Sequence, residues 1–350
     1  MSQFHTLSIQ SIKRITDKSV AISFGIPDDL KDAFTFAPGQ YITLKINIEG
    51  SEVRRAYSLC STPQEGLTVG VKEVENGTFS VYANRELKEG DTLEVHPPEG
   101  KFKIEDSAFA KAQHYAAFAA GSGITPILSM IKTTLAQSQD STFVLVYGNR
   151  TPEEAMFREE LLALRDQYKS RFSIEHIYSQ SRVDGAHFGR IMKSTVNFVV
   201  KNKYASHNFN DYFLCGPEAM VKEVTKVLKE NGVNDTNIHF ELFTASSEEG
   251  SVEAALDGQT NIKVVCDDED FEFVMKQTDL ILDAALDKDI DAPHSCQGGV
   301  CSSCIARVIE GTAEMEKNQI LTDAEVAEGL ILTCQAHPTS AKVVVDYDDV

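Results

Sequence analysis

Four cysteines toward the carboxyl end of the sequence have a spacing that suits metal ligation. Cys296, Cys301 and Cys304 lie within nine residues, and Cys334 follows thirty residues after the third. Structural zinc sites usually combine two close pairs of ligands. One close triplet followed by a distant fourth cysteine is instead the spacing of plant-type [2Fe–2S] ligation. The spacing therefore predicts a two-iron cluster held by these four thiolates.

The residues between these cysteines favour close wrapping of a small inorganic core. Gly298 and Gly299 permit backbone angles that other residues avoid, so that backbone N–H groups can point at the sulfurs. A structural zinc ion and unligated core cysteines are the alternatives that the spacing leaves open. Cys60 and Cys266 fall on strand patterns, and we expect them to be small core residues rather than ligands.

Two glycine-containing turns have the residues needed to bind a pyrophosphate. In "AAGSGITP", Gly121 and Gly123 open the turn, while Thr125 is expected as the helix N-cap and Pro126 as the first helical residue. "CGPEAM", residues 215–220, repeats this design after a later strand. Either turn alone could be purely structural. Two of them at the carboxyl ends of parallel strands indicate a dinucleotide site.

Residues after the next two strands bear on the choice of nicotinamide coenzyme. A carboxylate there would bind a ribose 2′-OH, but "YGNRT" provides Asn149 and Arg150, and "YSQSR" provides Ser179 and Arg182. Such groups suit a 2′-phosphate, which favours NADPH over NADH. The alternative is that both arginines are solvated surface residues.

The elements that position these groups follow from the hydrophobic patterning. Short alternating segments over residues 1–106 predict an antiparallel β-barrel or sandwich. Strand and helix patterns then alternate over 107–243, which predicts an α/β domain with a doubly wound parallel sheet. Small and polar residues at 244–259 predict a linker, and 260–350 predicts a compact mixed domain.

Composition and charge limit the partners. The 350 residues carry a formal net charge of −20, which disfavours binding to nucleic acid or to an anionic membrane. The sequence begins without a secretory signal and contains no apolar run long enough to span a bilayer, so we expect a cytoplasmic protein. Residues 259–350 contain 19 Asp or Glu and only 6 Lys or Arg. That excess suits either solubility or a partner with a basic docking patch.

The order of the motifs carries a resemblance to a known family. R-x-Y-S (Arg55 to Ser58) comes first, then G-x-x-S (Gly77 to Ser80), then the two glycine turns, and finally the cysteine triplet. This order resembles the ferredoxin–NADP⁺ reductase superfamily fused to a carboxyl-terminal plant-type ferredoxin domain. Within that family, the chain resembles the reductase subunits of phenylacetyl-CoA epoxidases and related oxygenase reductases. The likeness extends over nearly the whole chain.

The resemblance implies FAD on the barrel, a pyridine nucleotide on the α/β domain and a β-grasp-like α+β ferredoxin domain. No side chain is expected to act as a catalytic acid or base, since the cofactors carry the chemistry. For FAD it implies Arg55, Tyr57, Ser58, Gly77, Thr78 and Ser80, with Glu241 and Phe243 at the flavin. For the nucleotide it implies Gly121, Gly123 and Thr125, with Cys215 and Gly216 near the nicotinamide.

Taken together, the residues and the resemblance predict an electron-transfer enzyme. Electrons would pass from NADPH to FAD, then to the [2Fe–2S] cluster, and finally to a separate oxygenase, with phenylacetyl-CoA epoxidase as the first candidate. Reductases of steroid or aromatic-ring hydroxylases are the alternative within the class. A non-catalytic scaffold stabilised by zinc is the alternative from another class.

Overall fold

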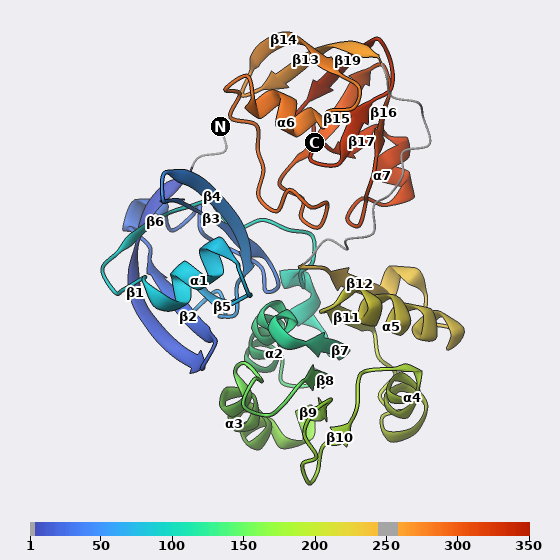
Figure 1. The fold of residues 1–350 in the computed structure, drawn as a ribbon. Coiled ribbons are helices and arrows are strands. Elements are labelled where there is room, and N and C mark those ends of the chain that lie inside the picture. Colours follow the sequence, from blue (N-terminus) through green and yellow to red (C-terminus); the bar gives the residue numbers. More distant parts are fainter. Residues whose placement is uncertain (1–3, 244–257) are drawn as a thin grey trace. The chain divides into compact units, whose positions relative to one another are not determined.

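The computed structural model describes residues 4–243 and 258–350. It divides into two compact units (Figure 1). The larger unit holds residues 4–53 and 57–243, and the smaller holds the carboxyl-terminal residues together with Arg54–Ala56. The linker expected at 244–259 lies almost wholly outside the described residues. No helix in the described ranges is both long and apolar enough to cross a membrane.

An antiparallel sheet forms the first part of the larger unit. Its strands are β1 (His5–Thr16), β2 (Ser19–Gly25), β3 (Tyr41–Ile48), β4 (Ser51–Ser58), β5 (Thr68–Lys72) and β6 (Thr92–Val95). They pair in the order β4-β3-β6-β1-β2-β5. An isolated bridge joins Leu59, directly after β4, to Val69 on β5, and so closes the sheet. The sequence left barrel and sandwich open, and the closure shows a barrel.

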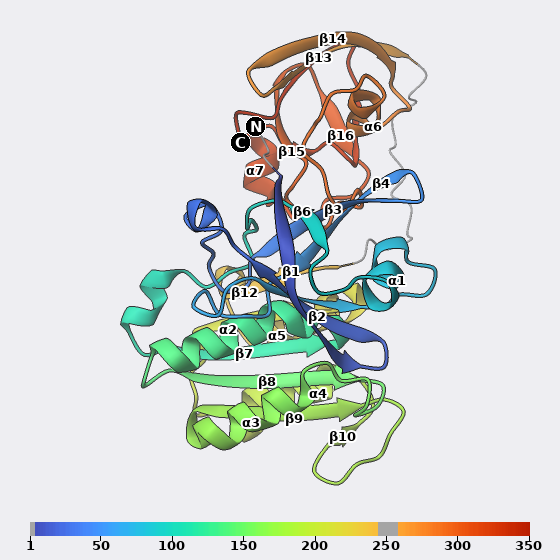
Figure 2. The same ribbon diagram turned by 90° about the vertical axis from the view of Figure 1, so that its left-hand side faces the viewer.

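A six-stranded parallel sheet forms the rest of the larger unit (Figure 2). Its strands are β7 (His114–Ala120), β8 (Thr142–Asn149), β9 (Phe172–Tyr178), β10 (His187–Phe188), β11 (Asp211–Cys215) and β12 (Ile238–Glu241). They lie in the order β10-β9-β8-β7-β11-β12. Successive strands are therefore added toward one edge of the sheet from β7 to β10, and toward the other edge from β11 to β12. Such a reversal point is where ligands bind in doubly wound sheets.

Helices cover both faces of this parallel sheet (Figure 1). They are α2 (Ile124–Gln137), α3 (Arg158–Tyr168), α4 (Lys193–Asn197) and α5 (Glu218–Glu230). Helices α2 and α3 pack together on one face, and α4 and α5 on the other. The predicted doubly wound architecture is confirmed.

The smaller unit is a five-stranded mixed sheet packed on one helix. Its elements are β13 (Gln259–Cys266), β14 (Glu269–Lys276), α6 (Ile281–Leu286), β15 (Ile305–Glu310), β16 (Ala313–Met315), α7 (Asp323–Ala327), β17 (Leu330–Leu332), β18 (Ala336–Pro338) and β19 (Lys342–Asp346). The sheet order is β14-β13-β19-β15-β17, with β13 and β19 parallel. Ile281 and Leu282 of α6 pack in the core with Val264 and Val343. This is the α+β arrangement that the resemblance implied.

Two helix starts differ from the sequence-based expectation. Helix α2 begins at Ile124 with Gly123 as its N-cap, because residues 121–123 form a 3-10 turn that runs directly into the helix. Thr125 is therefore inside the helix, where its hydroxyl donates to the Ser122 carbonyl at 3.0 Å. The G-x-x-S segment, Gly77 to Ser80, lies in a region where the sequence predicts only strands, but it starts helix α1 (Thr78–Arg85) after Gly77.

Candidate electron-transfer sites

Three predicted site residues from distant parts of the sequence meet in the larger unit. Cys215 and Glu241 are paired neighbours at the carboxyl ends of β11 and β12. The Ser58 hydroxyl, at the end of barrel strand β4, donates to Glu241 Oε2 at 3.0 Å. All three side chains are buried. The barrel and the parallel sheet therefore meet at the sheet edge where a dinucleotide would bind.

Burial controls the protonation of this group. It raises the pKa of the Glu241 carboxyl to about 8, although the hydrogen bond from Ser58 acts in the opposite direction. Burial, and then the nearby Glu241 carboxylate, raise the pKa of the Cys215 thiol well above its ordinary value. Both groups are therefore neutral at pH 7. The contact between Ser58 and Glu241 is therefore polar but uncharged.

The glycine turn after β7 lies directly against the end of β11. A Cβ atom at Gly123 would fall 2.1 Å from the Cys215 carbonyl oxygen, so no other residue fits there. The Tyr147 hydroxyl on β8 lies 3.0 Å from the Gly121 carbonyl oxygen and holds the turn from the other side. The two turns predicted to bind a dinucleotide are thus in contact, and an added Cβ at Gly121 would meet no atom within 4 Å, which leaves room for a pyrophosphate to approach.

The barrel residues predicted for the flavin lie on β4 and at the start of α1. The Tyr57 ring packs at a tilt against Phe79 of α1, with ring centroids 5.3 Å apart. Gly77 and Thr78 form the amino end of α1, whose N–H groups suit an anion. The buried Ser80 hydroxyl accepts from the Val74 N–H at 3.1 Å and fixes the preceding turn. Arg55, on β4, is exposed.

The residues predicted to recognise a 2′-phosphate lie at the carboxyl ends of β8 and β9. Ser179 N–H donates to the Asn149 carbonyl at 3.0 Å, and Gln180 N–H donates to the Arg150 carbonyl at 2.9 Å. These bonds tie the two loops together. The Arg182 guanidinium stacks over the Phe188 ring, 4.5 Å from its centroid. Both arginine side chains are exposed and accessible to a ligand.

Four of the five cysteines of the smaller unit, those predicted as iron ligands, converge through their sulfurs. The pKa of Cys296 is lowered chiefly by hydrogen bonds from the thiols of Cys301 and then Cys334, and the pKa of Cys304 chiefly by one from Cys334. The donors, Cys301 and Cys334, have raised pKa values for the same reason. The contacts therefore run in a row from Cys301 through Cys296 and Cys334 to Cys304. Within residues 4–243 and 258–350, no three His, Cys, Asp or Glu side chains surround a point as ligands of a single metal ion do.

The loop around these sulfurs has features that fit a sulfur-rich cluster. Gly298 N–H lies 3.3 Å from Cys296 Sγ and points a donor at it. Gly299 has a φ of +70°, and a Cβ there would meet the Gln335 side chain at 2.9 Å. The buried Ser295 hydroxyl, next to Cys296, has no hydrogen-bond partner among the described residues. Sulfur acceptors would satisfy it, since buried hydroxyls normally have a partner.

The remaining sequence-based expectations concern single residues. Cys60 and Cys266 are buried, as expected for core positions, and neither is near the four-cysteine loop in sequence. All seven cysteines are free thiols. Phe243 ends the first described range and is 37% exposed, so it is available to a ligand and does not fill the core.

Sequence reasoning did not identify the ionic contact that joins the barrel to the parallel sheet. Lys132 Nζ on α2 lies 2.6 Å from Glu65 Oε2 in the barrel and 2.9 Å from Glu160 Oε1 on α3. Lys132 is 15% exposed. Nothing in the sequence around Lys132 indicates that this side chain bridges two other elements.

A closed barrel, a parallel nucleotide-binding sheet and a four-thiol loop define a class of protein: oxidoreductases that bind FAD, NAD(P)H and a [2Fe–2S] cluster. Comparison with known families supports each part. Residues 6–104 match the oxidoreductase FAD-binding domain, 118–226 the oxidoreductase NAD-binding domain, and 264–339 the 2Fe-2S iron-sulfur cluster binding domain.

Comparison with individual proteins shows which members of this class the chain is similar to. It is 39% identical to a subunit of the 1,2-phenylacetyl-CoA epoxidase of Escherichia coli K12, over 99% of both chains. It is 32% identical to the ferredoxin reductase component of 3-ketosteroid-9-alpha-monooxygenase of Rhodococcus rhodochrous, over 97% of this chain and 96% of that one. The solved structure of phthalate dioxygenase reductase superposes with a TM-score of 0.61 and 27% identity, covering 98% of each chain.

The chain belongs to the ferredoxin–NADP⁺ reductase superfamily, among the members that carry a carboxyl-terminal [2Fe–2S] domain and act as reductase components of oxygenase systems. The relatives are named as subunits or components, which work with separate oxygenase components. The fold, the cofactors and the general function predicted from the sequence are confirmed.

Proposed function

We propose that this chain is the reductase subunit of a phenylacetyl-CoA epoxidase, acting in phenylacetate catabolism, with NADPH as electron donor. The observation that carries the proposal is the 39% identity, over nearly the whole of both chains, to the Escherichia coli epoxidase subunit. The ketosteroid relative, at 32%, covers a similar share at lower identity. A steroid or aromatic-ring oxygenase is therefore the second candidate acceptor.

The proposal assigns the two organic cofactors to the larger unit. Residues 1–106 would form the FAD domain and 107–243 the nucleotide domain, with 244–259 as linker and 260–350 as the ferredoxin domain. The FAD residues would be Arg55, Tyr57, Ser58, Gly77, Thr78, Ser80, Glu241 and Phe243. The nucleotide residues would be Gly121, Gly123, Thr125, Arg150, Ser179, Arg182, Cys215 and Gly216. The iron ligands would be Cys296, Cys301, Cys304 and Cys334.

The chain's own residues would bind and orient rather than donate protons. A pyridine nucleotide supplies two electrons as hydride, a [2Fe–2S] cluster accepts one at a time, and a flavin can mediate between them. The open space at Gly121, where an added Cβ would meet no atom within 4 Å, would let the pyrophosphate approach the turn. Buried Ser58 and neutral Glu241 exclude water from the sheet edge while keeping polar groups there.

The coenzyme preference and the partner are the finer parts of the proposal. Exposed Arg150 and Arg182, with Ser179 between their loops, support NADPH because two guanidinium groups can pair with a 2′-phosphate. The excess of acidic residues after Gln259 supports an oxygenase component with a basic docking patch. A cytoplasmic location and the absence of nucleic-acid binding stay predictions.

Reconstitution tests the proposed function. The purified chain, NADPH and the oxygenase component of a phenylacetyl-CoA epoxidase should together convert phenylacetyl-CoA, with NADPH consumed in step with product. The control replaces that component with the oxygenase of a 3-ketosteroid-9-alpha-monooxygenase. Faster turnover with the ketosteroid component would favour the second candidate. A colourless protein with stoichiometric zinc and no iron would favour the scaffold alternative.

A further inference from the structure

A buried carboxylate lies on the strand that leads into the loop carrying Arg182. Glu175 is on β9, and its side chain is 7% exposed. His187 Nε2 lies 2.9 Å from Glu175 Oε2, and Lys203 Nζ lies 2.5 Å from Glu175 Oε1. The Tyr204 hydroxyl donates to the same Oε1 at 2.6 Å. Side chains from later parts of the chain therefore converge on one residue of the parallel sheet.

These contacts keep Glu175 charged. Burial by itself would raise the pKa of this carboxyl, but hydrogen bonds from Lys203, Tyr204 and His187 together hold that pKa below its ordinary value. A carboxylate taken out of water is tolerated only where such partners compensate for the lost hydration. Glu175 therefore fixes the elements from which its partners come.

Two of these partners come from a π-helix. Lys203 is the last residue of the π-helix Phe198–Lys203, and Tyr204 directly follows it. Such helices are rare and occur frequently at functional sites. Phe198, at its start, packs edge-on against the His187 ring, with ring centroids 5.1 Å apart. The π-helix and β10 are thus joined directly as well as through Glu175.

The third partner, His187, belongs to the strand that ends the coenzyme loop. Strand β10 has only two residues, which pair in parallel with Ile177 and Tyr178 at the end of β9. Parallel strands are usually joined by a dozen or more residues, whereas 179–186 alone join β9 to β10. So short a pairing holds the loop weakly. The contact between His187 and Glu175 adds a second attachment.

The same short strand places Arg182. Successive side chains of a strand point to opposite faces of a sheet. Glu175 and Ile177 therefore share one face of β9, and His187 is the register partner of Ile177. Phe188 points to the opposite face, where the Arg182 guanidinium stacks over its ring, 4.5 Å from the centroid. A contact that fixes His187 thus also fixes the ring on which Arg182 rests.

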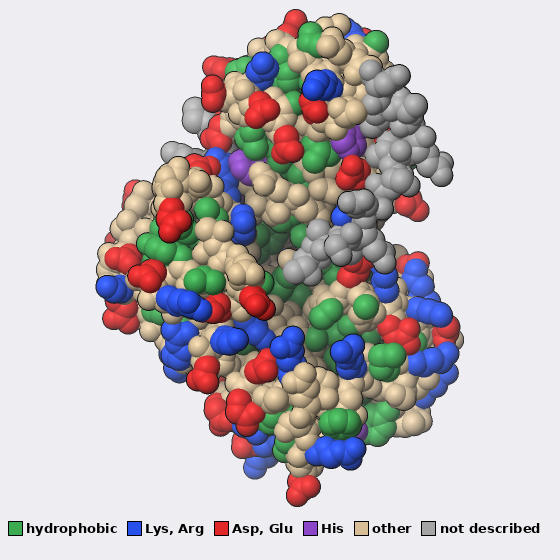
Figure 3. Space-filling model, viewed as in Figure 1, with side chains coloured by type: hydrophobic (Ala, Val, Ile, Leu, Met, Phe, Trp, Pro, Cys, Tyr) green, Lys and Arg blue, Asp and Glu red, His purple; other side chains and the backbone are tan. Residues whose placement is uncertain are grey.

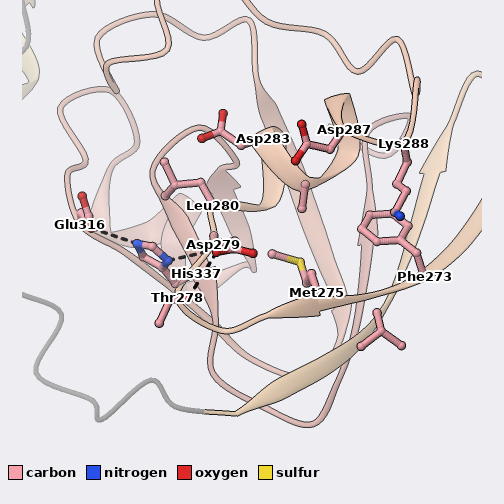
Figure 4. A pocket seen from close by; sticks show the side chains of 12 residues that line it. Phe273, Met275, Thr278, Asp279, Leu280, Asp283, Asp287, Lys288, Glu316 and His337 are labelled. Atoms are coloured by element: carbon pink, nitrogen blue, oxygen red, sulfur yellow. Dashed lines mark hydrogen bonds and ion pairs between the residues drawn. The ribbon is translucent and has the colours of Figure 1, made fainter.

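A contact between a histidine and a carboxylate also fixes a chain segment in the smaller unit. Buried His337 lies with Nε2 2.9 Å from Glu316 Oε1 and with Nδ1 3.1 Å from the Asp279 carbonyl oxygen (Figure 4). It ties the segment after Cys334 to the turn before α6. Its carboxylate is 37% exposed, so water shares in the solvation there. Glu175 depends far more on its protein partners, and losing one should have the larger effect.

We infer that Glu175 and His187 are positioning residues for coenzyme choice, holding residues 179–188 so that Arg182 can pair with the 2′-phosphate of NADPH. The inference rests on the proposed function, in which Arg182 and NADPH are assigned to each other. Glu175 and His187 act through Phe188 and Arg182. Their effect should therefore appear with NADPH and not with NADH, which lacks the 2′-phosphate.

The test measures steady-state kinetics of the holoenzyme with NADPH and with NADH. Ferricyanide is the electron acceptor, so that no oxygenase component is needed. Glu175→Gln and His187→Gln should each raise KM for NADPH about tenfold, as expected for the loss of a hydrogen bond to a charged group. KM for NADH should stay close to the wild-type value. His187 is 46% exposed, so its variant keeps the test available if Glu175→Gln does not fold.

Two controls separate positioning from general damage to the fold. His239 Nε2 lies 2.9 Å from Asp211 Oδ1 on neighbouring strands of the same sheet. His239→Gln removes this matched contact and should leave the preference for NADPH unchanged. In an Arg182→Ala background, Glu175→Gln should raise KM for NADPH no further, because both residues act through one contact.

Three results would overturn the inference. They are an equal rise in KM for both coenzymes, the same effect from His239→Gln, and a full additional rise in the Arg182→Ala background. Variants that keep the wild-type preference for NADPH would overturn it as well, and would leave the proposed function standing. If the wild type itself uses NADPH and NADH equally well, the proposed coenzyme preference is wrong and the inference falls with it.

Discussion

Glu241 is a carboxyl group that the fold keeps neutral. It is 8% exposed, and its pKa of about 8 comes from burial. Since the unfolded chain would ionise it near its ordinary value of 4.5, folding holds a proton that the unfolded state releases. The contribution of this group to stability is therefore greatest below pH 4.5, and it is lost progressively as the pH rises to about 8.

Glu241→Gln should remove this pH dependence. The variant keeps a neutral, hydrogen-bonding side chain beside Ser58, so we expect it to match the wild type near pH 4 and to exceed it at pH 8 by up to about 4 kcal/mol. Thermal melts of both holoproteins across that range measure the difference. Parallel curves would show that Glu241 is ionised in the folded protein.

Cys301 provides the second test at the scale of a residue. Cys301→Ala removes one of the four converging thiols, and we expect the iron content to fall and cytochrome c reduction to be lost. Ferricyanide, which accepts electrons directly from a flavin, should still be reduced at close to the wild-type rate. Survival of both activities would show that the four-cysteine loop is not on the electron path.

At the scale of elements, the turn after β7 can pack against the end of β11 only because residue 123 is a glycine. Gly123→Ala would place a Cβ against the Cys215 carbonyl and force the turn away from β11. We expect a loss of about 1–3 kcal/mol in stability and a higher KM for NADPH. Gly121→Asn is the control for stability, since φ is +57° there and nothing lies within 4 Å. Equal melting temperatures for the two variants would contradict the crowding argument.

The contact of α2 with the barrel and with α3 makes a second prediction at this scale. Lys132→Met leaves Glu65 and Glu160 facing each other without their cation, so we expect a loss of about 1–3 kcal/mol at pH 7. The control is Lys31→Met, because Lys31 and its partner Asp28 are 65% and 95% exposed. Chemical denaturation of the holoproteins measures both.

Strands and helices with a clear hydrophobic pattern could be predicted from the sequence. Short helices without such a pattern could not. Strand and helix alternation gave the parallel sheet and its helices. Helix α1 was not predicted, because Gly77, Thr78 and Ser80 are residues that favour turns. In the structure they begin a helix that packs against β5. The six-residue π-helix Phe198–Lys203 has no local signal at all.

The candidate sites divide in the same way. The four cysteines proposed as iron ligands could be identified because plant-type [2Fe–2S] ligation uses a fixed spacing of three thiolates in one loop and a distant fourth. The bond between Ser58 and Glu241 joins residues 183 positions apart, and only the closure of the barrel onto the sheet brings them together. Each was predicted separately, through resemblance, and their direct contact was not.

At the scale of the whole molecule, charge is distributed unevenly. The face seen in Figure 3 shows acidic side chains spread over the smaller unit and basic ones gathered over α5 of the larger unit. Association with a basic oxygenase should therefore slow as salt screens the attraction, whereas electron transfer within the chain should not. Stopped-flow measurements from about 0.05 M to 0.5 M salt compare the two steps. Equal salt dependence of both would count against charge-guided association.

The crowding at Gly123 limits how coenzyme use can diverge in this fold. Position 123 has no room for an added Cβ, so a coenzyme bound at this edge would meet the same backbone whether it were NADH or NADPH. We therefore expect a change of coenzyme preference to arise in the loops after β8 and β9, where Arg150 and Arg182 are exposed. Redesign of coenzyme choice should therefore begin at Arg150, Ser179 and Arg182 and leave the glycine turns untouched.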